Sequence, residues 1–135
     1  MKGQTSTEFV ILTTFMLLVF LVFLILIQTK MSEGIVEKNN ILAQSILDKV
    51  IYEIRLAEAV SDGYEKQFIL PSFLENGIAY NLIIIGYPGG GELVIRYENT
   101  EKVYFLDTQI NSSSNIGIGR NIIKKNNGIV EIQKI

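Results

Sequence analysis

Carboxylates are the main residues of this 135-residue chain that could do chemistry. The sequence has 14 Asp and Glu residues and 12 Lys and Arg residues, and it has no His and no Cys. The absence of His and Cys excludes the usual zinc ligands, the Ser/His and Cys/His nucleophile pairs and thiol redox chemistry. Two carboxylate pairs, Glu53 with Glu58 and Glu98 with Glu101, could be imagined as a general acid and base. Because no supporting motif accompanies them, we interpret them as solvated surface residues and expect neither an enzyme nor a cofactor.

Glycine-rich and basic segments point to no ligand either. Gly89-Gly90-Gly91 is followed by no Lys-Ser or Lys-Thr, and the next segment alternates like a strand, so a hairpin turn is favoured over a phosphate-binding loop. Lys124-Lys125 is too small for a nucleic-acid patch, and the net charge of -2 supplies no cationic surface around it. We therefore expect no nucleic-acid partner.

Asn111-Ser112-Ser113 has the Asn-X-Ser pattern of an N-glycosylation acceptor. It lies in a polar stretch, residues 108–120, whose Asn, Ser and Gly content predicts a surface loop between strands. An outward-facing loop would make Asn111 reachable for modification. An ordinary unmodified loop is the alternative.

The strongest signal is an apolar stretch near the start of the chain. Residues 9–27 read FVILTTFMLLVFLVFLILI, with Thr13 and Thr14 the only polar residues and no charge. A helix of this length crosses most of the hydrocarbon core of a bilayer. Because every face is apolar, lipid or other apolar helices must surround it. The residues that follow, Gln28 to Met31, offer no small-residue cleavage site, so we expect the mature protein to keep the segment.

Glu8 lies at the edge of this apolar segment. An unpaired carboxylate that enters hydrocarbon costs a few kcal/mol, so Glu8 requires a partner or a helix N-terminus. An alternative is that Gln4 and Glu8 are ordinary interfacial residues of a single-pass anchor, with Thr5 or Ser6 as the helix cap.

The stretch Gly3-Gln4-Thr5-Ser6-Thr7-Glu8-Phe9 resembles the class III signal peptide of archaeal type IV pilin-like proteins. The family pattern is Gly, Gln, any residue, Ser, any residue, Glu, Phe, and every specified position matches. The resemblance implies that a prepilin peptidase cuts between Gly3 and Gln4, which makes residues 1–3 a leader. It also implies that Glu8 pairs with the freed amine of Gln4 on a neighbouring subunit. This leader is shorter and less basic than many in the family.

The same resemblance implies a role for the apolar helix. Copies of it would leave the membrane through an ATP-driven assembly machine and bundle into the core of a homopolymeric surface pilus for adhesion or cell contact. The expected core residues are Phe9, Phe15, Leu18, Phe20, Phe23 and Ile27. The precursor would lie in the cytoplasmic membrane. Two alternatives stay open, a minor or initiating pilin and a single-pass membrane-anchored extracellular binding module.

The rest of the chain predicts an α+β fold. Apolar residues recur at helical spacing from Ile35 to Ala57, which extends the predicted helix over residues 4–62. Gly34 and Asn39-Asn40 are weak helix formers that could loosen or kink it. Ser61-Asp62-Gly63 supplies a stop signal.

Strand patterns follow the predicted helix. They begin at Gln67 and continue over residues 78–84, 92–98, 103–106, 121–125 and 129–135. Hairpin turns are predicted at Pro88-Gly89-Gly90-Gly91, at residues 98–101 and at Asn127-Gly128. Short turns between strands indicate a mostly antiparallel sheet. We expect residues 63–135 to form a β-rich head whose apolar face is covered by helix residues 35–57.

Overall fold

A computed structural model describes residues 2–135, with side chains from Ser6 onward. The first element is helix α1 (Lys2–Ala59), which is 58 residues long. Gly34 and Asn39-Asn40 do not interrupt it, in agreement with the single predicted helix. The helix ends three residues before the predicted residue 62. Gly63 then adopts a φ of 90°, the left-handed conformation that follows many helix ends.

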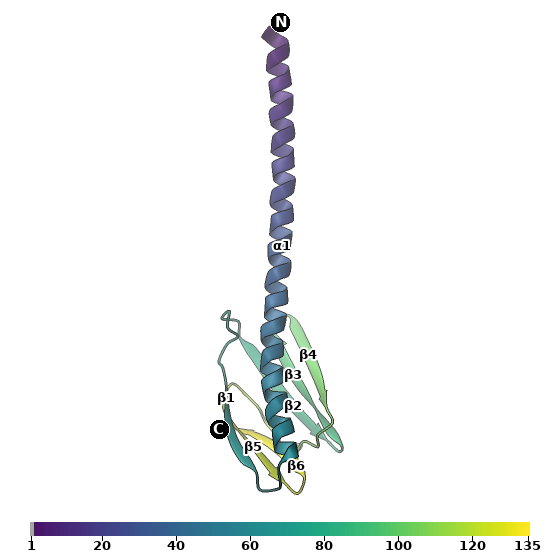
Figure 1. The fold of residues 1–135 in the computed structure, drawn as a ribbon, viewed down its shortest axis with the longest axis vertical. Helices are drawn as coiled ribbons and strands as arrows, with labels where there is room; N and C mark the ends of the chain where they lie inside the picture. Colours follow the sequence, from purple (N-terminus) through teal and green to yellow (C-terminus); the bar gives the residue numbers. More distant parts are fainter. Residues whose placement is uncertain (1) are drawn as a thin grey trace. The chain divides into compact units, whose positions relative to one another are not determined.

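The chain divides into two compact units, Met1–Lys38 and Asn39–Ile135. In its described residues, the first unit consists of the N-terminal part of α1. The second unit, called the head below, contains the rest of α1 and every described strand. Figure 1 shows these strands beside the C-terminal part of the helix.

The strands of the head form two three-stranded sheets rather than the single sheet that was expected. One sheet has the order β1-β5-β6 and the other β2-β3-β4, and all neighbouring strands are antiparallel. The predicted α+β class with an antiparallel C-terminal part is therefore confirmed. The strands are β1 (Glu65–Leu70), β2 (Tyr80–Tyr87), β3 (Gly90–Tyr97), β4 (Thr100–Leu106), β5 (Gly119–Asn126) and β6 (Ile129–Lys134).

Three tight connections follow the predicted turns. β2 and β3 are joined through Pro88 and Gly89, and Gly89 has a φ of 88°. β5 and β6 are joined through Asn127 and Gly128, which both have positive φ as a type I′ hairpin requires. Glu98, between β3 and β4, also has a positive φ of 49°. These local signals sufficed to predict three of the strand pairings.

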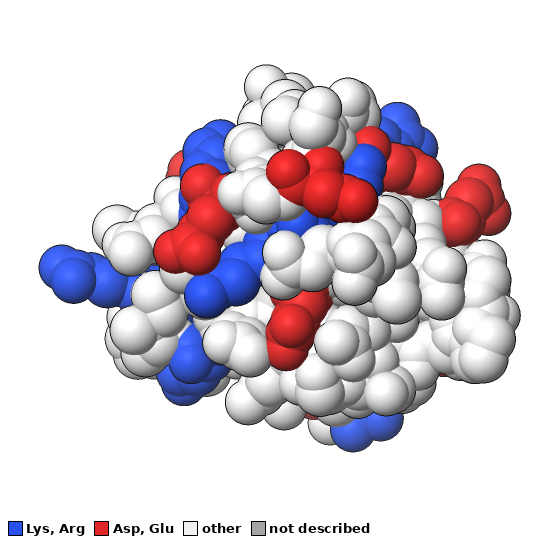
Figure 2. Space-filling model, turned by 90° about the horizontal axis from the view of Figure 1, so that it is seen from below, with Lys and Arg blue, Asp and Glu red and all other residues white. Residues whose placement is uncertain are grey.

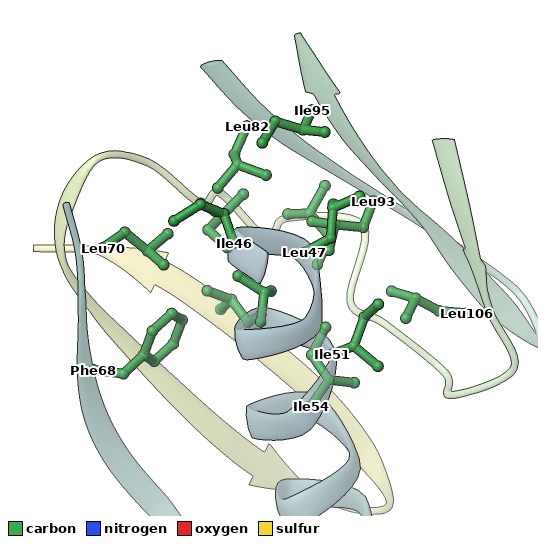
Figure 3. Close-up of a cluster of buried hydrophobic side chains, with 14 of the residues drawn as sticks. Ile46, Leu47, Ile51, Ile54, Phe68, Leu70, Leu82, Leu93, Ile95 and Leu106 are labelled. Atoms are coloured by element: carbon green, nitrogen blue, oxygen red, sulfur yellow. The ribbon is translucent and has the colours of Figure 1, made fainter. Parts of the chain in front are cut away.

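One side of α1 is buried against both sheets. The buried apolar residues of the helix lie on one side at spacings of one or three positions, and they are Ala43, Ile46, Leu47, Val50, Ile51, Ile54 and Ala57. They pack among inward-facing side chains of the two sheets, including those that Figure 3 labels on the strands: Phe68, Leu70, Leu82, Leu93, Ile95 and Leu106. Ile35, which was expected to begin this covering face, is 58% exposed. The first buried residue of α1 is Asn39, which is 2% exposed.

Asn39 and Asn40 attach α1 to the β2-β3-β4 sheet. Asn39 is buried, and its amide nitrogen donates to Glu98 Oε2 at 3.3 Å. The side-chain oxygens of Asn39 and Asn40 accept hydrogen bonds from Asn76 and Tyr97, respectively. Asn is a weak helix former, yet these two residues hold α1 in place because their side-chain amides hydrogen-bond to other parts of the head.

Glu53 corrects the expectation of a solvated carboxylate. It is buried on α1, and Lys66 Nζ on β1 lies 2.9 Å and 2.8 Å from its two carboxylate oxygens. The hydrogen bond to Glu53 raises the pKa of Lys66 above its ordinary value. The pair links α1 to the β1-β5-β6 sheet.

The polar stretch of residues 108–120 is only partly a surface loop. Ile110 and Ile116 are buried in the core, and Ser114 is buried and accepts a hydrogen bond from Ile132 N. Fully buried Asn121 follows on β5, where its side chain bonds the backbone of Gly117 on both sides. Side-chain amides satisfy the backbone of the stretch, which lets it pack inside.

Candidate functional site

The candidate site is the apolar part of α1 between Phe9 and Ile27. Its large apolar side chains are exposed, from 41% for Leu24 to 68% for Phe9, except for half-buried Val19. By length and composition α1 can cross a membrane, and no other helix among the described residues can. None of its most apolar stretch is buried within the chain. Something outside the chain must cover this surface, because water does not stabilise so large an apolar area.

The six predicted core residues do not all share one face of the helix. At about 100° per residue, Phe9, Phe20, Phe23 and Ile27 fall within one narrow stripe. Phe15 and Leu18 lie on other faces. A single neighbouring helix could cover the stripe, whereas covering all six residues requires several neighbours or lipid.

The hydroxyl groups in this segment are satisfied within the helix itself. Thr13 Oγ1 donates to Phe9 O at 2.7 Å, and Thr14 Oγ1 donates to Val10 O at 2.8 Å. Thr29, just beyond the segment, donates in the same way to Ile25 O at 3.0 Å. Polar hydrogens bonded to the preceding turn remain satisfied in a medium without water. The two threonines therefore do not prevent burial of the segment.

Glu8 lies one position before the apolar stretch on an exposed part of α1. Among the described side chains, none forms an ion pair with it. The cleavage prediction depends on Gly3 and Gln4, and the structure describes only the helical backbone at these two residues. Cleavage before Gln4 and the pairing of Glu8 with a neighbour stay predictions.

Exposed apolar residues continue past Ile27. Met31, Ile35 and Val36 are all exposed, and they are interspersed with the surface ion pair between Lys30 and Glu33, whose atoms lie 2.8 Å apart. An exposed pair of this kind contributes little to stability. This part of α1 thus presents a mixed surface instead of the uniform apolar one of residues 9–27.

Asn111 is half-buried where the chain passes beside β6. Its backbone N–H donates to Val130 O at 2.8 Å, and its side-chain oxygen accepts from Ser113 N at 3.0 Å. Ser113 Oγ lies 3.0 Å from the same oxygen. These two contacts from Ser113 form a turn around the carboxamide oxygen of Asn111. N-glycosylation of Asn111 stays a prediction.

The carboxylates considered for acid and base chemistry each bind a different group. Glu53 pairs with Lys66, while Glu58 accepts from Thr108 Oγ1 at 2.8 Å. Glu98 accepts from Asn39, and Glu101 pairs with Arg96. The four carboxylates therefore have separate partners, and only Glu53 is buried.

Acidic groups do not gather into a metal site in the part of the chain that the structure describes. No group of three or more Asp and Glu residues is placed to hold a metal ion there. On the face shown in Figure 2, positive and negative side chains are interspersed with uncharged residues. The exposed apolar helix is therefore the most distinctive feature of the described surface.

No protein-family model, curated protein or solved structure matches the chain.

Proposed function

We propose that this protein is a structural subunit of an archaeal type IV-like pilus. The observation that carries the proposal is the apolar segment of residues 9–27, whose large side chains are exposed apart from half-buried Val19. This segment directly follows Gly3-Gln4-Thr5-Ser6-Thr7-Glu8. An apolar surface on every side of a helix needs cover on every side. Lipid supplies that cover to the precursor in the cytoplasmic membrane, and the same segments of other copies supply it in the surface filament.

Glu8 is proposed to act in both processing and assembly. Cleavage before Gln4 creates a new amine on the same helix end, and a neighbouring copy brings that amine to Glu8. Two opposite charges at the edge of an apolar bundle offset each other's desolvation, whereas an isolated carboxylate does not. The partners are further copies of the chain, a prepilin peptidase and an ATP-driven assembly machine. The filament serves adhesion or cell contact.

A comparison of two carboxylate variants tests the proposal. Glu8→Ala removes the proposed partner of the new terminus, and Glu37→Ala removes another exposed carboxylate of the same helix as a matched control. In cells that make the protein, surface material is sheared off and separated from membranes. We expect the wild-type chain and Glu37→Ala in the sheared filaments and a loss of Glu8→Ala from them.

A membrane-anchored binding module gives the opposite result. Its head would stay in the membrane fraction for all three chains, and Glu8→Ala would behave like the wild type. That outcome would contradict the pilus proposal.

A further inference from the structure

The β2-β3-β4 sheet has an apolar face directed away from α1. Side chains alternate along the strands, and Leu82, Ile84, Leu93 and Ile95 face the core. The intervening side chains form two cross-strand rows on the other face. We call these rows the outer patch, and they consist of Ile83, Val94 and Val103, then Ile85, Glu92 and Phe105.

The outer patch has an apolar rim and one carboxylate. Phe105 is 67% exposed and Ile85 is 48% exposed, on the two strands that flank β3. Glu92 stands between them and has no ion-pair partner among the described residues. Two such patches placed face to face would bring two carboxylates together, which is unfavourable. A covering surface must therefore supply apolar side chains and a cation.

The outer face of the β1-β5-β6 sheet is mostly polar. Glu65 on β1 is directly opposite Lys124 on β5, and Lys124 Nζ lies 3.3 Å from Glu65 Oε2. Glu131 on β6 is opposite Lys124 on its other side. Gln67 and Gln133 occupy the next row with Ile122 between them. In these rows Lys124 pairs with Glu65, and Gln133 Nε2 donates to Glu131 Oε1 at 2.8 Å.

The last row of this face is different. Ile69 on β1 is directly opposite Arg120 on β5, and Ile135 N donates to Arg120 O at 3.0 Å. Ile69 is 59% exposed and Ile135 is 63% exposed. Arg120 is exposed and has no ion-pair partner among the described residues. We call this row the arginine row.

We propose that the outer patch of one copy of this chain binds the arginine row of a second copy, with Glu92 facing Arg120. The proposal rests on the proposed function, in which many copies lie side by side. An anion between two apolar side chains meets a cation between two apolar side chains, so both charge and hydrophobicity match. Carboxylate and guanidinium groups also form paired hydrogen bonds.

The geometry of this contact suits a filament. The two surfaces are different, so each copy keeps one free outer patch or one free arginine row after binding. A contact of this kind is heterologous and extends into an open polymer when the rotation between copies does not close. Lys134, another cation without a carboxylate partner among the described residues, is a poorer candidate because its side chain lies against Gly117.

Introduced thiols test the contact cleanly because the chain has no Cys. Full-length copies carrying Glu92→Cys are produced together with full-length copies carrying Arg120→Cys in the cells that make filaments. Sheared filaments and membranes are treated with a short bismaleimide, and cross-linked peptides are identified by mass spectrometry. Each copy has a single thiol, so every cross-link joins two copies. Lys124→Cys replaces Arg120→Cys in the control and lies about 13 Å further along β5 on the same face.

We expect cross-linked peptides that join positions 92 and 120, and their loss in the Lys124→Cys control. Filaments that form normally without this cross-link would overturn the contact and leave the pilus proposal intact. Cross-links between two copies of position 92 would also overturn it. The expected cross-link found in membranes without any filaments would support the contact and contradict the pilus. Neither cross-links nor filaments would contradict both.

A charge exchange provides a second readout that does not depend on cross-linking. Glu92→Arg alone and Arg120→Glu alone should each lower the filament yield, because like charges then face each other between copies. The chain with both substitutions should recover it. A double variant that stays as low as the single variants would count against the contact.

Discussion

Residues 9–27 and residues 43–57 belong to one helix, yet their apolar side chains have opposite surroundings. In the first segment nearly every large apolar side chain is exposed, on all faces. In the second, a single stripe is buried against two sheets and the charged residues occupy the rest of the circumference, except for Glu53. Local backbone hydrogen bonds hold both segments in the same conformation. The difference shows that only the second segment carries its own cover within the chain.

The two segments differ in what they contribute to the fold. The head completes its core with residues of one chain, so its stability should depend on the buried stripe. The first segment contributes no packing to that core, so its side chains are free to serve an external partner. Substitutions of the same kind in the two segments should therefore have different consequences.

The largest effect is expected from a matched pair of leucines. Leu47→Ala should lower the free energy of unfolding of the head by about 2–5 kcal/mol, because Leu47 is almost fully buried. Leu18→Ala should leave it within about 0.5 kcal/mol, since Leu18 is exposed. The measurement is denaturant unfolding of the full chain in detergent, followed by near-ultraviolet tyrosine circular dichroism. All six tyrosines belong to the head, so the signal is specific. Equal losses for the two variants would contradict the comparison.

A smaller effect is expected at the buried carboxylate of the second segment. Glu53→Gln removes the charge that Lys66 binds and should destabilise the head by about 1–3 kcal/mol. Glu37→Gln, on the exposed part of the same helix, is the control and should leave stability unchanged. The same unfolding measurement applies. If the two variants unfolded alike, the Glu53–Lys66 pair would have no structural role.

The pH dependence of the free energy of unfolding tests the burial of Tyr80 in the head. Burial raises the pKa of Tyr80 from 10.0 to about 12, and its hydroxyl donates to Pro71 O at 2.5 Å. The stabilisation is complete below about pH 10 and is lost as the pH rises to 12, because the unfolded chain releases this proton first. Tyr80→Phe should reduce the loss of stability at alkaline pH. Some loss should remain in this variant, because burial also raises the pKa of Tyr97. Urea midpoints between pH 8 and 12 measure the slope, and an unchanged slope in Tyr80→Phe would contradict this assignment.

The smallest effect is expected at the boundary between the segments. Ile35→Ala should change the stability of the head by less than about 0.5 kcal/mol, because Ile35 precedes the covered part of α1. Val36→Ala should behave in the same way. A loss of more than about 1 kcal/mol in the free energy of unfolding corresponds to burial of at least a methyl group. Such a loss would show that the covered face begins at Ile35, as the periodicity predicts.

Local signals in the sequence were enough for much of the fold. The helical periodicity, the apolar run and turn residues such as Asn127-Gly128 act over a few positions, and they predicted α1 and three hairpins. The division into two sheets was missed, because β1 pairs with β5 across about 50 residues and no local pattern encodes that pairing. Glu53 was misinterpreted for the same reason, since its partner Lys66 reaches it only through β1.

The candidate site was predictable to a similar extent. An apolar segment that lacks an amphipathic period must be covered from outside, and its exposure on α1 agrees with that expectation. The helical repeat places Phe9, Phe20, Phe23 and Ile27 in one stripe, whereas Phe15 and Leu18 lie on other faces. The outer patch and the arginine row were not predictable, because their rows combine residues that are far apart in the sequence and depend on strand register.

The central claim is that residues 9–27 are covered first by lipid and then by other copies, after cleavage before Gln4. Mass spectrometry of the N-terminal peptide, in sheared surface filaments and in membranes, tests it most directly. We predict a chain in the filaments that begins at Gln4, and any added mass on Asn111 would appear in the same spectra. A chain found only in membranes, with its terminus intact at Met1 or Lys2, would contradict the account and identify residues 9–27 as a permanent single-pass anchor.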